Sequence, residues 1–194
     1  MSFLLKWYLR YRYPKFQRAY RLVFDPEGFH HYPKELKEQV EGKSKDDTLD
    51  SLRKTLKPYI VAGKDTQTQT TLTMLAELIP VLPQILEMTI QLANWPSLAN
   101  KDKKHFISVV AYIVSPVDII PEGVYGGAGF ADDLLFASIA YRAVITDTSE
   151  KFVSAFWKGE KKLFETLCSL EGAAKESLPE LHNEVTKAFR TVFA

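Results

Sequence analysis

An apolar segment at residues 71–93 constrains the fold more than any other part of this sequence. Glu77, Pro80, Pro83 and Glu87 interrupt it, whereas a membrane-spanning helix requires about 20 mostly apolar residues. We therefore expect a helix over residues 71–94 that is buried in a protein core rather than in a bilayer. The sequence leaves open whether this chain or another chain covers that helix.

Apolar residues elsewhere recur mainly with the spacing of an α-helix. The predicted helices cover residues 34–41, 47–57, 98–113, 130–145, 149–170 and 177–193. The first two are charged and have only a thin apolar stripe, which is typical of surface helices. Residues 63–70 lack apolar side chains and are expected to form a loop or the frayed start of a helix. Because no segment alternates with the period of a β-strand, the prediction is an all-α, single-domain helical bundle.

Composition and charge divide the chain into three predicted parts. Residues 1–28 form a basic aromatic arm, residues 29–65 form charged surface helices with a loop, and residues 66–194 form the helical core, including the last two helices. The content of 46% hydrophobic and 25% charged residues is that of an ordinary globular protein. The one cysteine, Cys168, excludes an intrachain disulfide. The predicted location is cytoplasmic, with peripheral attachment to a membrane as a variant.

The N-terminal arm combines basic and aromatic side chains and has no acidic residue in its first 24 positions. Its aromatic residues, Trp7 among them, recur with helical spacing and predict a basic amphipathic hairpin or a kinked helix. The arm can pack on its own core, or it can dock on a partner protein or an anionic membrane surface. Nucleic acid is disfavoured because no recognised nucleic-acid motif accompanies the arm. The predicted docking residues are Trp7, Arg10, Arg12, Lys15, Arg18 and Arg21.

The segment SPVDIIPEGVYGGAGFADDLL begins at Ser115 and opens with a helix-start pattern. Ser115 is a good N-cap, Pro116 suits the first helical position, and the Asp118 carboxylate can reach back to the cap. A short helical turn is then expected to end at Pro121.

The second half of the same segment contains glycines followed by two acids. Gly126 and Gly129 allow a bend with positive backbone angles. Asp132 and Asp133 are expected in the first turn of the next helix, where the helix dipole favours negative charge. These structural roles account for all the aspartates of the segment.

A chemical role for the same acids is the competing interpretation. The bend can bring Asp118, Asp132 and Asp133 together, and Glu122 can add another oxygen ligand. Such oxygens suit Mg²⁺ or Ca²⁺, although the spacing is not that of an EF-hand. No other cofactor is expected, because the histidines are scattered and no zinc motif is present.

Residues 105–141 also resemble a known family. The pattern S-P-x-D-x-I-P, a glycine-containing bend and then D-D-L is similar to the signature of the YkvA-like family of unknown function. Glu122, Gly126 and Gly129 resemble the copy in a eukaryotic membrane-bound RING-type ubiquitin ligase. The resemblance implies a small helical protein or domain, some members having membrane segments, and implies no reaction or cofactor. Ligase activity is not implied, because a RING requires several cysteines and histidines to hold its zinc ions.

The leading functional prediction is a non-catalytic interaction module that docks on a partner protein or an anionic membrane surface. Association with a second copy of the chain is a further possibility. The alternative is a divalent-metal-dependent hydrolytic enzyme that uses Asp118, Asp132 and Asp133.

Overall fold

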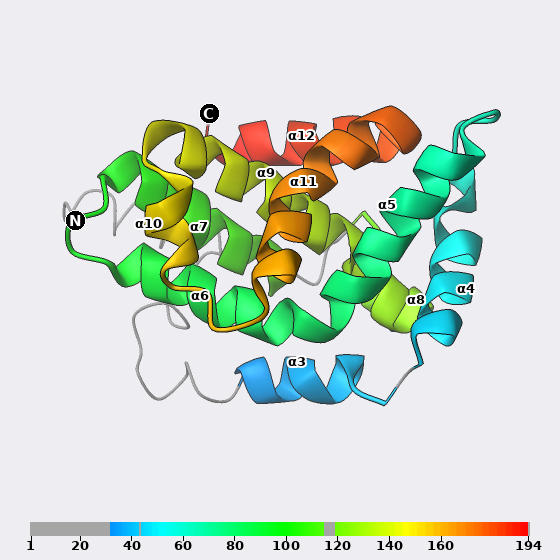
Figure 1. Cartoon of the computed structure of the whole chain (residues 1–194), viewed down its shortest axis with the longest axis horizontal. Helices are drawn as coiled ribbons and strands as arrows, with labels where there is room; N and C mark the ends of the chain where they lie inside the picture. Colours follow the sequence, from blue (N-terminus) through cyan, green and yellow to red (C-terminus); the bar gives the residue numbers. More distant parts are fainter. Residues whose placement is uncertain (1–31, 43, 115–118, 194) are drawn as a thin grey trace.

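Helices make up nearly all of the backbone in the computed structural model, which describes residues 32–42, 44–114 and 119–193 (Figure 1). The helices and the 3₁₀ turns (η) are α3 Tyr32–Val40, α4 Lys45–Leu56, η2 Lys57–Tyr59, α5 Asp65–Leu78, η3 Ile79–Val81, α6 Leu82–Asn94, α7 Asn100–Ile113, α8 Glu122–Tyr125, η4 Gly126–Phe130, α9 Ala131–Asp147, α10 Glu150–Ser154, α11 Lys161–Ser177 and α12 Pro179–Phe193. The described ranges contain no β-strand. The prediction of an all-α fold is confirmed.

The core lies where α6, α7 and α9 pack side by side, with α11 packed against α5 and α9. Leu86 of α6, Phe106 of α7 and Phe136 of α9 are completely buried. The rings of Phe106 and Tyr141 lie 5.1 Å apart and join α7 to α9. The helices predicted at 71–94, 98–113 and 130–145 therefore do form the core.

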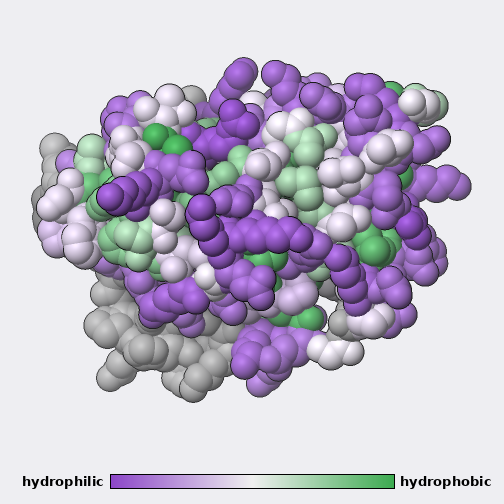
Figure 2. Space-filling model, in the orientation of Figure 1, coloured by the Kyte–Doolittle hydropathy of each residue, from purple (hydrophilic) through white to green (hydrophobic). Residues whose placement is uncertain are grey.

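Outer helices cover this core with their apolar stripes turned inward. In Figure 1, α3 runs beneath α6, α4 lies beside α5, and α12 lies along the top next to α9. Leu36 and Val40 of α3 are buried, as are Leu52 and Leu56 of α4. The opposite faces of these helices are charged, so the surface in Figure 2 is largely hydrophilic, with apolar patches between the polar side chains.

The apolar segment predicted as one helix is two α-helices joined by the η3 turn. Pro80 and Pro83 each sit in the first turn of a new element, where a missing N–H costs little. Within the described residues, one stretch, Asp65–Asn94, is long and apolar enough to cross a membrane by length and composition, and 61% of its apolar window is buried in the protein. A buried core helix passes the same test. Leu82, Ile85 and Leu86 have no exposed surface, so this chain itself covers much of the segment.

Two expected boundaries need correction, and the first concerns residues 63–70. This stretch was expected to be a loop or the frayed start of a helix, and from Asp65 onward it is the regular start of α5. Its threonines supply the reason: Thr68 and Thr71 are buried, and the Thr71 hydroxyl lies 2.8 Å from the Ser177 hydroxyl of α11. Hydrophobic periodicity missed this packing because threonine counts as polar.

The second correction concerns the single helix expected over residues 149–170, which is wrong. Ser149 does cap a helix there by accepting from the Phe152 N–H, but α10 ends at Ser154 and α11 starts at Lys161. Between them the Trp157 indole N–H donates to the Glu160 carbonyl at 2.8 Å. A β-carbon on Gly159 would lie 2.6 Å from the Trp157 ring, so the turn depends on the glycine.

Candidate functional site

The candidate site is the corner where α7, the segment from Ile119 and the start of α9 meet. Asp132 and Asp133 lie in the first turn of α9, as predicted, and both side chains are completely buried. Ser115, Pro116 and Asp118 lie outside the described residues, so their predicted capping roles stay predictions. The same holds for the docking residues of the arm: Trp7, Arg10, Arg12, Lys15, Arg18 and Arg21.

The Asp132 carboxylate joins three parts of the chain. Its Oδ2 accepts hydrogen bonds from the Tyr112 hydroxyl at 2.9 Å and from the backbone N–H groups of Ile119 at 3.0 Å and Ile120 at 3.4 Å. The Tyr112 ring stacks on Phe136 of α9 at 4.3 Å, which directs the hydroxyl toward the carboxylate. Asp132 therefore holds α7 and the segment before α8 against α9. Sequence reasoning expected only an interaction with the dipole of its own helix and missed these partners.

Burial and hydrogen bonding act in opposite directions on the Asp132 pKa. Loss of solvent raises the pKa, and the bonds from Tyr112, Ile119 and Ile120 lower it. Burial dominates and the pKa rises to about 6. The other oxygen, Oδ1, is buried and has no hydrogen-bond partner among the described residues. The carboxyl group is thus well suited to holding a loop, and it is protonated far more readily than an exposed aspartate.

Glycines shape the turn that follows. Gly126 has a φ of 58° and a ψ of −139°, a conformation that side-chain-bearing residues rarely adopt. At Gly129 the need is for space, because an added β-carbon would lie 2.5 Å from the Glu122 α-carbon. The predicted positive backbone angle is therefore present at Gly126 but not at Gly129. The connection is nevertheless helical, since α8 and η4 fill it.

Pro121 has a different role from the one expected. It was expected to end a helical turn, but it is the N-cap residue of α8, and its carbonyl accepts from the N–H groups of Val124 and Tyr125 at 3.1 Å each. The residues just before it, Ile119 and Ile120, form a bend that Asp132 binds. A proline followed by a glutamate is compatible with the end of one helical turn or with the start of the next helix. The hydrogen bonds from Ile119 and Ile120 to Asp132 decide for the start of α8.

The corner presents two apolar side chains to solvent. Among the described residues the large exposed hydrophobic side chains are Trp95, Val124 and Tyr125. Trp95 packs edge-on against Phe156 at 5.0 Å, whereas Val124 and Tyr125 are neighbours on α8 and are 71% and 45% exposed. We call this pair the α8 tip. Through the α8 tip, the corner exposes apolar surface to solvent.

The proposed cation ligands are only partly described. Within the described ranges, no three His, Cys, Asp or Glu side chains gather closely enough to hold a metal ion. Glu122 is half-buried at the start of α8, and Asp132 uses one oxygen for the three donors named above. Since Asp118 is outside the described part of the chain, the four-ligand prediction stays a prediction.

Cys168 is the remaining candidate for reactivity. It lies half-buried on α11 and packs against the core. Burial, with the nearby Glu150 as a second cause, raises the pKa of its thiol to about 12. The thiol is therefore un-ionised at neutral pH, and Cys168 acts as a small hydrophobic residue of α11.

Comparison with known proteins matches this corner to a family without an assigned function. Residues 103–139 match the profile of the family described as "Protein of unknown function (DUF1232)". The "Uncharacterized protein ORF9" of Methanothermobacter thermautotrophicus is 33% identical over 89 residues, which cover 46% of this chain and 61% of that protein.

Shorter matches come from a second group of proteins. The "E3 ubiquitin-protein ligase RNF170" of Xenopus tropicalis is 47% identical over 47 residues, covering 21% of this chain and 18% of that protein. The Danio rerio protein of the same name is 48% identical over 44 residues, or 19% and 16% of the two chains. The chain thus spans less than two thirds of each relative. No solved structure matches. The corner built around Asp132 is accordingly the part of the chain that is similar to a family of proteins of unknown function.

Proposed function

We propose that this chain is a non-catalytic helical interaction module that docks on a partner protein through the α8 tip. The observation that carries this proposal is the exposure of Val124 and Tyr125 side by side on a helix of four residues. Contiguous exposed apolar surface rimmed by polar residues marks interaction sites, and tyrosine is among the side chains that contribute most to protein–protein binding.

The way the corner is built supports this use. Asp132 accepts hydrogen bonds from the backbone N–H groups just before α8, and Gly129 allows Glu122 to approach η4 closely. These contacts fix the position of α8 before any partner arrives. A preformed tip loses little conformational entropy on binding.

An anionic membrane surface is the alternative target, and the predicted basic arm favours it. We further propose that the corner is of the YkvA-like type, which rests on the S-P-x-D-x-I-P and D-D-L pattern. Attachment from the cytoplasmic side is consistent with both targets.

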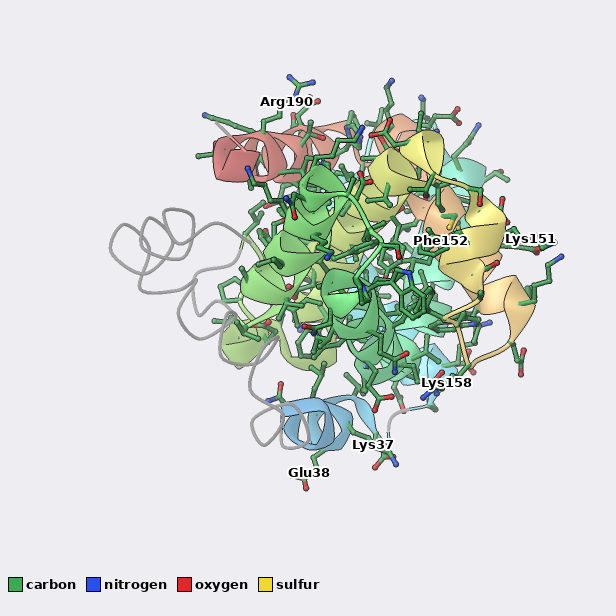
Figure 3. The ribbon with its side chains drawn as sticks, turned by 90° about the vertical axis from the view of Figure 1, so that its left-hand side faces the viewer. Lys37, Glu38, Lys151, Phe152, Lys158 and Arg190 are labelled. Carbon is green, nitrogen blue, oxygen red and sulfur yellow. The ribbon has the colours of Figure 1, made fainter. Side chains whose placement is uncertain are left out.

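Site-specific cross-linking tests the proposal in cells that express the full chain. A photo-reactive p-benzoylphenylalanine replaces Tyr125, and the matched control places it at Lys151, which projects from the exposed side of α10 (Figure 3) at the end of the bundle away from α8 (Figure 1). A discrete protein adduct at position 125 and not at 151 supports docking, and an adduct of twice the chain's mass identifies a second copy as partner. Lipid adducts point to the membrane alternative instead. Equal labelling at the two positions overturns docking at the tip.

The arm has its own test with lipid vesicles. If the arm binds an anionic membrane, replacing Arg10, Lys15 and Arg18 by glutamate abolishes co-sedimentation with anionic vesicles at low salt. Unchanged co-sedimentation removes the arm from the membrane alternative.

A divalent-metal-dependent hydrolase that uses Asp118, Asp132 and Asp133 is the second candidate. It is favoured by one observation, the buried Oδ1 of Asp132 without a hydrogen-bond partner among the described residues. A cation is one way to satisfy such an atom. Calorimetric titration with Mg²⁺, Mn²⁺, Ca²⁺ and Zn²⁺ separates the candidates: a melting shift that Asp132→Asn abolishes supports the enzyme, and the absence of heat and of any shift removes it.

A further inference from the structure

A groove lined by polar residues lies on the opposite edge of the bundle from α3 and is separate from the α8 tip. It lies along α12 and the end of α11 and has a volume of about 490 Å³. The lining residues are Lys175, His182, Asn183, Thr186, Lys187, Arg190 and Thr191. All are polar and none is acidic. Figure 2 shows hydrophilic side chains along the upper edge, where Figure 1 places α12.

The positively charged side chains of this groove have no direct ion-pair partners in the described part of the chain. Lys175, Lys187 and Arg190 form no ion pair with any residue of the described part of the chain. In contrast, Lys45 and Lys101 elsewhere on the surface pair with acids at 2.7 and 2.6 Å. The Arg190 side chain extends away from α12 at the top of Figure 3.

The acidic residues near this groove in the sequence do not line it. Glu171 pairs with Arg142 at 3.0 Å and lies 3.6 Å from His182 Nε2. Glu180 and Glu184 of α12 act on Tyr59, whose pKa rises through burial first and then through the negative charge of Glu184. Neither Glu180 nor Glu184 lines the groove.

Two polar atoms of the lining residues also lack hydrogen-bond partners. Thr186 Oγ1 and His182 Nε2 are both shielded from solvent, and neither makes a hydrogen bond with the described residues, although Glu171 Oε1 lies 3.6 Å from His182 Nε2. The His182 side chain is about nine-tenths buried. Buried polar atoms are normally satisfied, so an oxyanion or a water held in the groove would supply what Thr186 Oγ1 lacks.

From this arrangement we propose that the α11–α12 groove binds a phosphate monoester. Such a group carries a charge of about −1.5 to −2 at neutral pH and presents three acceptor oxygens. The groove offers two lysines, one arginine and neighbouring hydroxyls, which can donate to several phosphate oxygens at once. A ligand with a single carboxylate would leave some of these cations without an acceptor. The volume suits a small phosphorylated molecule, and the open edge also admits a phosphorylated lipid headgroup. The site is independent of docking through α8.

The test uses the full chain with defined probes in two arms. In the soluble arm, inorganic phosphate is titrated while backbone amide shifts are followed by NMR, and the expected shifts are confined to residues 175–191. In the membrane arm, vesicles containing phosphatidic acid, a monoester, are compared with vesicles containing phosphatidylglycerol, a diester. Binding of phosphate without selective vesicle binding identifies a soluble ligand, and preference for phosphatidic acid identifies the headgroup.

Matched variants separate a site from general attraction to positive charge. The triple variant Lys175→Gln, Lys187→Gln, Arg190→Gln removes three groove charges. The control Lys151→Gln, Lys158→Gln, Lys162→Gln removes three exposed charges that are also unpaired among the described residues. We expect the groove variant to weaken phosphate binding by about tenfold or more and the control by less than about twofold.

Three results would overturn the inference. They are amide shifts scattered over the whole surface, equal weakening by the two triple variants, and absence of any response to phosphate in the unmodified chain at low salt. Circular dichroism melts of the variants check folding, and both should match the unmodified chain because all six side chains are exposed.

Discussion

Two buried polar contacts made by α9 differ in charge. The Tyr141 hydroxyl is neutral, whereas the Asp132 carboxyl group can ionise. Tyr141 lies in the core and its hydroxyl is 2.8 Å from Thr89 Oγ1 of α6, which in turn donates to the Ile85 carbonyl at 2.7 Å. Asp132 lies nine residues earlier and binds the segment before α8 through one oxygen only. The first contact is a closed chain of neutral hydrogen bonds between two rigid helices.

The second contact carries an electrostatic cost that the first avoids. Burial raises the Tyr141 pKa so that its hydroxyl stays neutral, and it also raises the Asp132 pKa toward neutrality. A buried carboxylate is retained here because a backbone segment outside a regular helix needs an acceptor for its N–H groups.

Replacing Asp132 should have the largest effect on stability. Asp132→Ala leaves the Tyr112 hydroxyl and the N–H groups of Ile119 and Ile120 without their acceptor, which should lower the free energy of unfolding by about 4 kcal/mol. Asp132→Asn keeps a carbonyl acceptor and should cost about half as much. Denaturant unfolding at neutral pH measures both, and equal losses would show that the hydrogen bonds are not what holds the corner.

The pH dependence of the same residue should follow from its raised pKa. Because the folded state holds the Asp132 proton up to about pH 6, and the unfolded state only to about pH 4, the contribution of this residue to stability is greatest below pH 4. It should fall by up to about 3 kcal/mol as the pH rises from 4 to 6. The measurement is the stability difference between the unmodified chain and Asp132→Asn at pH 4 and pH 7. A difference that moves the other way would mean that hydrogen bonding outweighs burial.

The glycine that sets the shape of the corner should show an intermediate effect. Gly129→Ala places a β-carbon against the Glu122 backbone and should cost about 2 kcal/mol through displacement of α8. Gly123→Ala is the control, because nothing lies within 4 Å of its added β-carbon, and it should be neutral or stabilise α8 by about 0.5 kcal/mol. Thermal melts of the pair suffice, and similar melting temperatures would contradict the close approach.

Loss of the Tyr141 hydroxyl, which contacts Thr89 in the core, should have the smallest effect on the free energy of unfolding. Tyr141→Phe removes one hydroxyl and leaves Thr89 bonded to the Ile85 carbonyl, so the expected cost is about 1 kcal/mol. Thr89→Val should cost more, since it leaves the buried Tyr141 hydroxyl without a partner. In a double-mutant cycle the combined cost should be smaller than the sum. An additive result would show that the two hydroxyls do not interact.

Regular helices with clear apolar periodicity were predictable from the sequence. The helix at 98–113 and the start of α9 at Asp132 and Asp133 appear as expected, because apolar spacing and acidic first turns are local properties. The break between α10 and α11 was not predictable in this way. It depends on the Trp157 indole reaching the Glu160 carbonyl and on the space at Gly159, which are contacts rather than spacings.

In the candidate corner, too, local features were predictable from the sequence and contacts between distant residues were not. The residues themselves determined that a proline- and glycine-rich turn joins two core helices and that two acids begin the second helix, since those preferences act within a few residues. Only the tertiary structure decided that the Asp132 oxygen faces Tyr112 and the N–H groups of Ile119 and Ile120, that Pro121 starts α8, and that Gly129 lies against Glu122. These contacts join positions up to 20 residues apart, and their geometry exists only once α7 and α9 have packed together.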